Sequence, residues 1–138
     1  MGDSRISHLI ELNIMTNRKE VMIVAKQFIL YNLKDDVKEE DFIKFVNEYK
    51  GPFIAGLPAV KRYTLTTVKR AMQAKGGPPG PVEPPYRIAA VVDLTSLEDY
   101  AKDQQSQAYR EEFLPRFAQY AQDVLILQSD EFYDKESD

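Results

Sequence analysis

Four stretches of the chain combine β-branched and aromatic residues in short apolar runs, which predicts strands. They cover residues 21–33, 60–68, 86–94 and 123–132. The first and third runs are apolar on both alternating faces. A strand of that kind must be covered on both sides, so a sheet containing them needs a partner on each face.

The second run, residues 60–68, differs from the first and third in carrying many polar residues. A period of two defines two faces. One face carries Val60, Arg62, Thr64, Thr66 and Val68, and the other carries Lys61, Tyr63, Leu65 and Thr67. The threonine-rich face is polar enough to border a wet cavity. It is equally typical of an edge strand with one solvated face.

A helix is predicted between the first two strands. Its apolar stripe has the spacing i, i+3, i+4 and i+7, formed by Phe42, Phe45, Val46 and Tyr49. Asp36 and Glu39 have the spacing of a capping box at its start. Gly51 and Pro52 are expected to end or kink it.

A second helix is predicted between residues 96 and 121. Ser96 stands three residues before Asp99, which favours Ser96 as the N-cap. Pro115 lies inside the apolar pattern, so it is expected to kink this helix or to begin a new one.

Residues 69–85 contain the run KGGPPGPVEPP, which excludes a regular helix or a central strand. A phosphate-binding loop is also excluded, because no Lys-Ser or Lys-Thr pair follows and the prolines remove backbone amides. The segment is predicted to be a long hairpin connection. Two interpretations remain open, a mobile flap over a pocket and a disordered loop.

The order strand, helix, strand, strand, helix, strand predicts an α+β, ferredoxin-like βαββαβ fold with a four-stranded antiparallel sheet. We divide the chain into an N-terminal extension (1–20), the domain itself (21–133) and an acidic C-terminal tail (134–138). Two helices on one face leave the other sheet face bare. A second copy of the sheet is its simplest cover, so we predict a homodimer through the open sheet face.

Composition limits the classes of function. The net charge of −4 argues against nucleic-acid binding, and no apolar run approaches the roughly 20 residues that span a membrane. There are no cysteines, which excludes thiolate metal sites and cysteine nucleophiles. His8, the single histidine, is interpreted as a solvated residue rather than a metal ligand or general base. We therefore expect a cytoplasmic protein without metal or cofactor.

The helix-to-strand segment 42–63 resembles a known family signature. Its pattern is Phe42-x-x-Phe45-Val46, then Tyr49-Lys50-Gly51-Pro52, then Leu57-Pro58-x-Val60-x-x-Tyr63. This is similar to the dimeric α+β barrel superfamily, most closely to its EthD-like branch. The resemblance covers about residues 21–133 and implies a dimer of facing sheets, with a cavity between each sheet and its helices.

The resemblance implies a range of activities, among them cofactor-independent monooxygenases, polyketide cyclases, lactone isomerases and haem enzymes. The family's frequent histidine before the proline has no counterpart, because Tyr49, Lys50 or Gly51 holds that place. This departure argues against a histidine-based mechanism and against haem.

Polar and aromatic residues on the predicted strands and helices suggest a site for a small-molecule ligand. We predict catalytic roles for Tyr63, Arg62 and Asp93, since tyrosine and arginine can stabilise an enolate and a buried acid can act as base. The predicted substrate-binding residues are Tyr31, Tyr49, Lys26 and Tyr109. Two purely structural interpretations also remain open. In one the tyrosines are core residues, and in the other Arg62 and Asp93 form a structural ion pair.

Two functions are compatible with these residues. One is a cofactor-independent enzyme of the monooxygenase, cyclase or isomerase type, acting on an aromatic or polyketide-like substrate. The alternative is a non-catalytic dimeric protein that binds a ligand or assists another enzyme, favoured by the lack of cysteine and of a histidine in the domain.

Overall fold

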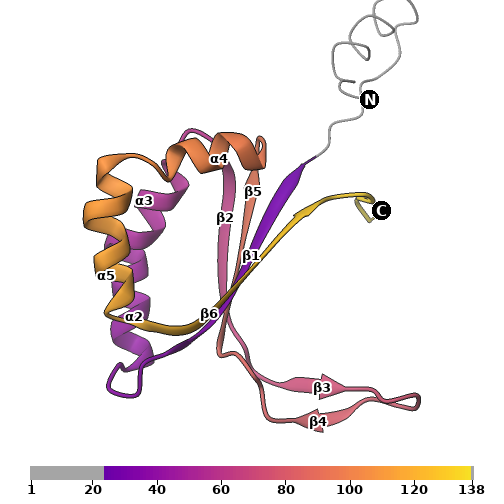
Figure 1. The fold of residues 1–138 in the computed structure, drawn as a ribbon. Coiled ribbons are helices and arrows are strands. Elements are labelled where there is room, and N and C mark those ends of the chain that lie inside the picture. The colour runs from indigo at the N-terminus through magenta and orange to yellow at the C-terminus, as the bar shows by residue number, and fades with distance from the viewer. Residues whose placement is uncertain (1–23, 138) are drawn as a thin grey trace, which may run out of the picture.

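The computed structural model describes residues 24–137. Strands β1 (Ala25–Leu33), β2 (Val60–Thr67), β5 (Ile88–Leu94) and β6 (Ala121–Asp130) form one antiparallel sheet in the order β2-β5-β1-β6. The helices all lie on one face of this sheet and leave the other face open (Figure 1). The predicted ferredoxin-like α+β fold is confirmed.

The first helical segment runs through three parts, α2 (Glu39–Phe45), the π-helical turn η1 (Val46–Lys50) and α3 (Gly51–Ala55). The sequence predicts that Gly51 and Pro52 end or kink the helix, and they do not end it, because the helix continues through Ala55. The π-helical turn lets the helix continue, because the N–H of Gly51 reaches the carbonyl of Val46. The helix ends at Gly56 instead.

The predicted capping box at the start of this helix is wrong. Lys38 occupies the N-cap position, and no side chain caps it. The first turn is held by backbone bonds alone, with the N–H of Phe42 donating to the carbonyl of Lys38 at 3.1 Å. Acidic residues in that turn complement the helix dipole.

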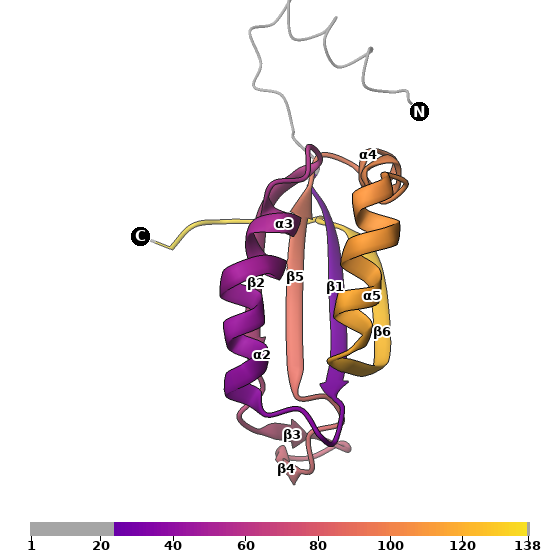
Figure 2. The ribbon, with the colours of Figure 1, turned by 90° about the vertical axis from the view of Figure 1, so that its left-hand side faces the viewer.

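The second helical segment is interrupted, as predicted. It consists of α4 (Leu97–Asp103), a second π-helical part η2 (Ala108–Phe113) and α5 (Leu114–Ala118). The Ser96 hydroxyl accepts a 2.9 Å hydrogen bond from the N–H of Asp99, which confirms the predicted cap. Pro115 lies in the first turn of α5, where its missing N–H costs little. Figure 2 looks onto the two helical segments side by side over the sheet.

The glycine- and proline-rich segment forms a two-stranded ribbon of β3 (Ala71–Gln73) and β4 (Gly80–Val82). It projects away from the helical layer (Figure 1). The predicted hairpin connection is confirmed, with a paired ribbon in place of a disordered loop. The ribbon does not cover the space between sheet and helices, as a flap over that space would (Figure 1).

A β-bulge corrects the predicted faces of β2. The pairing with β5 shifts between Val60 and Arg62, so strict alternation fails there. Val60 consequently packs in the same core cluster as Tyr63, not on the face of Arg62. Arg62 lies opposite Asp93 on the open face.

Two buried clusters hold the helices on the sheet. One contains Ala25, Ala59, Val92, Leu94 and Tyr100, and the other contains Tyr31, Phe42, Ile88 and Ala121. Ile29 of β1 packs against both, so the core is continuous along the central strand.

Some predictions concern residues or properties that the fold does not test. His8 and the predicted N-terminal extension lie outside the described residues. Within residues 24–137, none of the helices has the length and apolarity to cross a membrane. The same part of the chain contains no cluster of acidic or histidine side chains that could hold a metal.

Candidate functional site

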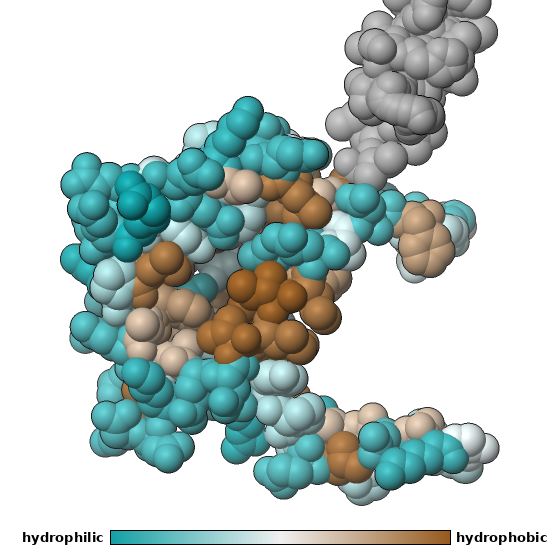
Figure 3. Space-filling model, in the orientation of Figure 1, coloured by the Kyte–Doolittle hydropathy of each residue, from teal (hydrophilic) through white to brown (hydrophobic). Residues whose placement is uncertain are grey.

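A cavity of about 280 Å³ lies between the helical layer and the helix-facing side of the sheet. Figure 3 shows hydrophobic surface on both sides of the hollow between α5 and β6. A cavity of roughly 150 Å³ with apolar walls can hold a benzene molecule, so this one has room for a small aromatic ligand. Its apolar walls are formed by Ile29, Ile54, Val92, Phe113, Leu114, Phe117, Val124 and Ile126.

The charged group of this cavity is Lys50, the last residue of η1. Lys50 is only 5% exposed, and its amine donates a hydrogen bond to the hydroxyl of Tyr63. The amine also lies 4.8 Å from the ring centre of Phe117 and 4.9 Å from that of Tyr63. Within residues 24–137 no carboxylate oxygen lies within 4.0 Å of this amine. The two ion pairs found in that part of the chain are both formed by Lys26.

Burial without a carboxylate changes the protonation of Lys50. Desolvation lowers the pKa of its amine from 10.5 to about 7. Aromatic ring faces favour the cation, but they replace only part of its lost hydration. Near neutral pH a large fraction of Lys50 therefore carries a free lone pair. A strongly shifted pKa in a cavity is a mark of functional residues.

Local sequence explains why a lysine lies inside. Val46, Lys50 and Ile54 follow at four-residue steps, so Lys50 belongs to the buried stripe of the first helical segment. Gly51 supports this geometry, because a Cβ there would lie 2.8 Å from the carbonyl oxygen of Val46. Our sequence analysis did not assign Lys50 a role. The available signal was a lysine between two apolar residues of one helical face.

Three phenols face the cavity together with Lys50. Tyr63 comes from β2, Tyr100 from α4 and Tyr109 from η2. Burial raises the pKa of each of these hydroxyls above its usual value. They therefore stay protonated at neutral pH and can donate hydrogen bonds to an oxygen atom of a ligand.

Glutamine side chains complete the polar lining. Gln27 is 3% exposed and accepts a 2.9 Å hydrogen bond from the amide of Gln128 across β1 and β6. Gln104 donates to the hydroxyl of Tyr109 at 3.1 Å. The cavity thus offers one amine, neutral hydroxyls and amides on otherwise apolar walls.

The structure brings part of the predicted site together. Tyr63 and Tyr109 line the cavity. Tyr31 is fully buried beside it, with its ring centre 6.0 Å from the amine of Lys50. Burial raises the pKa of Tyr31, whose hydroxyl has no hydrogen-bond partner among the described residues.

The other predicted polar residues lie on the open face of the sheet. Lys26 and Asp93 form an ion pair at 2.6 Å, and this hydrogen bond raises the pKa of Lys26 despite some desolvation. Arg62 is opposite Asp93 in the register, but the ion pair of Asp93 is with Lys26. These residues face away from the cavity, and their predicted catalytic and binding roles stay predictions.

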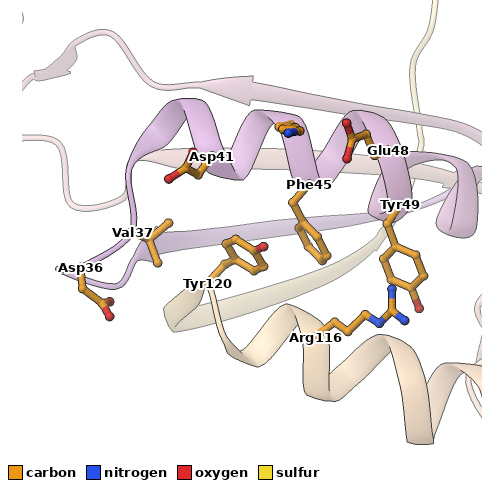
Figure 4. A pocket seen from close by; sticks show the side chains of 9 residues that line it. Asp36, Val37, Asp41, Phe45, Glu48, Tyr49, Arg116 and Tyr120 are labelled. Carbon is orange, nitrogen blue, oxygen red and sulfur yellow. The ribbon is translucent and has the colours of Figure 1, made fainter.

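Tyr49 lies in a separate groove of about 530 Å³ between the two helical segments (Figure 4). The guanidinium of Arg116 stands 4.3 Å from the ring centre of Tyr49. This groove shares no lining residue with the Lys50 cavity. The predicted substrate-binding role of Tyr49 therefore concerns a different part of the surface and stays a prediction.

The element order and the antiparallel sheet define the class of ferredoxin-like α+β proteins. Within it, the chain belongs to the family described as REDY-like protein HapK, whose family model matches residues 25–132. No protein of curated function matches the chain.

Solved structures share the fold at low identity. HapK from Hahella chejuensis is 15% identical, with 83% of this chain and 98% of that protein covered and a TM-score of 0.63. A dimeric ferredoxin-like protein of unknown function from Thermobifida fusca is 19% identical, with 78% and 90% covered and a TM-score of 0.54. An EthD family protein from Bacillus halodurans is 11% identical, with 79% and 99% covered and a TM-score of 0.56. The predicted resemblance to EthD-like dimeric barrels is confirmed.

Proposed function

We propose that the protein is a cofactor-independent enzyme that binds a small aromatic or polyketide-like molecule in the Lys50 cavity. The proposed reaction is the removal of a proton from the carbon next to a carbonyl group. The observation that carries the proposal is the amine of Lys50, buried among aromatic rings and bonded to Tyr63 without a carboxylate nearby in the described chain.

The two polar partners divide the work. The neutral amine of Lys50 can act as the general base that removes the proton. Its pKa of about 7 keeps a large fraction of this amine neutral near neutral pH. Tyr63 stays protonated because burial raises its pKa. Its hydroxyl can therefore donate a hydrogen bond to the carbonyl oxygen as negative charge develops there, as in an oxyanion hole.

Apolar and aromatic walls select the ligand. Phe113 and Phe117 are stacked with an angle of 11° between their planes, and both line the cavity. Flat rings and short acyl chains fit such walls, whereas a charged ligand would lose its hydration. The volume of about 280 Å³ limits the ligand to a small molecule.

The proposal includes a homodimer through the open face of the sheet. Phe28, Leu125 and Leu127 are 38–46% exposed there. The register assigns these side chains to the open face. Ile126 lines the cavity, so its neighbours Leu125 and Leu127 point to the opposite face of the sheet, and Phe28 is paired with Leu127. Phe132, which follows β6, is 99% exposed. Exposed apolar residues gathered on one sheet face indicate a protein interface.

Exchange of ligand C–H hydrogens for deuterium tests the proposed reaction without knowledge of the natural substrate. Acetophenone, an aryl methyl ketone, is incubated in D₂O with wild-type protein and with Lys50→Met, and loss of the methyl signal is followed by NMR. We expect exchange that depends on Lys50. Binding of the ketone without any Lys50-dependent exchange would instead favour the non-catalytic ligand-binding alternative.

A further inference from the structure

We propose that Lys50 acts as a nucleophile and forms a covalent imine with its ligand, so that the substrates are aldehydes or ketones rather than acids or esters. This inference rests on the proposed function for the place of the ligand, and it adds the route by which the amine acts. The geometry that carries it is an amine at the wall of an apolar cavity, with the Tyr63 hydroxyl in contact and no carboxylate within 4.0 Å in the described residues.

The side chains around the Lys50 amine are compatible with imine formation. The titratable groups that face it are phenols, Tyr31 from β1, Tyr63 from β2, Tyr100 from α4 and Tyr109 from η2. Asp103, the last residue of α4, has its carboxylate engaged elsewhere, since it accepts a 2.8 Å hydrogen bond from the N–H of Ala59. A lysine desolvated in this way is an activated nucleophile toward carbonyl groups.

The covalent step balances with water as its only by-product. The lone pair of the Lys50 nitrogen forms a bond to the carbonyl carbon, and the carbonyl π electrons move to oxygen, which takes up a proton with Tyr63 as the adjacent donor. The nitrogen of the carbinolamine then returns one proton to Tyr63, its second proton leaves with the hydroxyl group as water, and the C=N bond forms. Protonation of the imine creates an electron sink, which acidifies the neighbouring C–H bond.

The site favours the imine over its hydrolysis. An imine buries one polar atom fewer than the amine and the carbonyl together, and the released water leaves an apolar cavity. Gln27 and Gln104 remain to hydrogen-bond other polar groups of the ligand. A carboxylic acid ligand would instead bring its own charge and protonate the amine as an ion pair.

Reductive trapping tests the inference on the whole chain of 138 residues. The protein is incubated at pH 7 with benzaldehyde and sodium cyanoborohydride, which reduces imines faster than aldehydes, and is then analysed by intact mass and peptide mapping. We expect one benzyl group, located at Lys50, before the exposed lysines are labelled. Unfolding the same protein in urea should abolish this preference, which provides a control without any variant.

Two variants sharpen the result. Lys50→Arg keeps a cation and Lys50→Met keeps an apolar side chain of similar length, and neither should show the early label. Acetophenone exchange is measured in parallel on all three proteins. Labelling of wild type at exposed lysines with no preference for Lys50 overturns the inference, whether or not the variants fold.

The two measurements separate this inference from the proposed function. Lys50-dependent exchange without a trapped adduct means that the amine acts only as a base, so the imine is wrong and the proposed function stands. An adduct at Lys50 without exchange means that the site captures carbonyl compounds, so the imine stands and the proposed proton transfer is wrong. Absence of both contradicts the two together.

Discussion

The amine of Lys50 donates a hydrogen bond to the hydroxyl of Tyr63, and this contact joins the π-helical turn η1 to strand β2 across the cavity. The two groups have opposite protonation behaviour. Burial lowers the pKa of Lys50 to about 7 and raises that of Tyr63. Near neutral pH a free amine and an intact phenol therefore meet at one point, which is the arrangement that a reaction at a carbonyl group requires.

The first prediction concerns stability. Lys50→Met should stabilise the protein below pH 7 by a few kcal/mol, because it removes a buried cation without a counter-ion. Between about pH 7 and 10.5 the folded wild type has lost this proton and the unfolded chain still binds it, so wild-type stability rises with pH in that window. The difference between variant and wild type should consequently shrink from pH 6 to pH 9.

Urea denaturation at both pH values, at one protein concentration, measures this difference. Lys44→Met is the control, since Lys44 is an exposed lysine of the same helical segment. A difference between wild type and Lys50→Met that is the same at pH 6 and pH 9 would show that Lys50 is not a buried titrating group.

The second prediction concerns the pH dependence of exchange. The rate of acetophenone exchange should rise with pH to a midpoint near 7 and then level off, because the neutral form of Lys50 is the active one. Tyr63→Phe should lower the rate by about 10²-fold while leaving this midpoint in place, since the removed hydroxyl stabilises the developing enolate.

Tyr133→Phe serves as the matched control for that experiment. It also removes one phenol hydroxyl, from a residue that is 74% exposed and is not part of the cavity lining. If Tyr63→Phe and Tyr133→Phe exchange at equal rates, Tyr63 has no part in the reaction.

The sequence predicts the framework of this fold better than its site. Strand and helix periodicities depend on neighbouring residues, so the order of elements and the Ser96 cap could be predicted. The bulge beside Arg62 could not, because it depends on pairing with a strand that is distant in the sequence. That bulge, together with the register, decides that Arg62 and Asp93 face away from the cavity.

Lys50 illustrates the second limit. Charged residues are normally expected at the surface, and a lysine inside an apolar stripe was not assigned a role. Its burial depends on aromatic rings from the second helical segment, such as Phe113 and Phe117. Contacts of that kind join residues more than 60 positions apart, so the periodicity of one helix does not contain them.

The third prediction concerns the π-helical turn. Gly51→Ala should destabilise the protein by about 1–3 kcal/mol, because the added Cβ would lie 2.8 Å from a backbone oxygen that cannot move freely. The strain should also displace Lys50 and reduce benzyl trapping. Gly77→Ala is the control, since a Cβ there meets nothing within 4 Å. Equal thermal stability of the two variants would remove the packing role assigned to Gly51.

The fourth prediction concerns assembly. Leu127→Lys should convert a dimer into a monomer, because it places a charge in the apolar patch of the open sheet face opposite Phe28. Ile43→Lys is a closely matched control: Ile43 is 43% exposed and Leu127 46%, but Ile43 lies on the helical layer. Native mass spectrometry and light scattering give the masses of both variants and of wild type. A monomeric wild type would contradict the dimer itself. Two dimeric variants would place the interface on another surface, and a monomer formed only by Ile43→Lys would assign it to the helices.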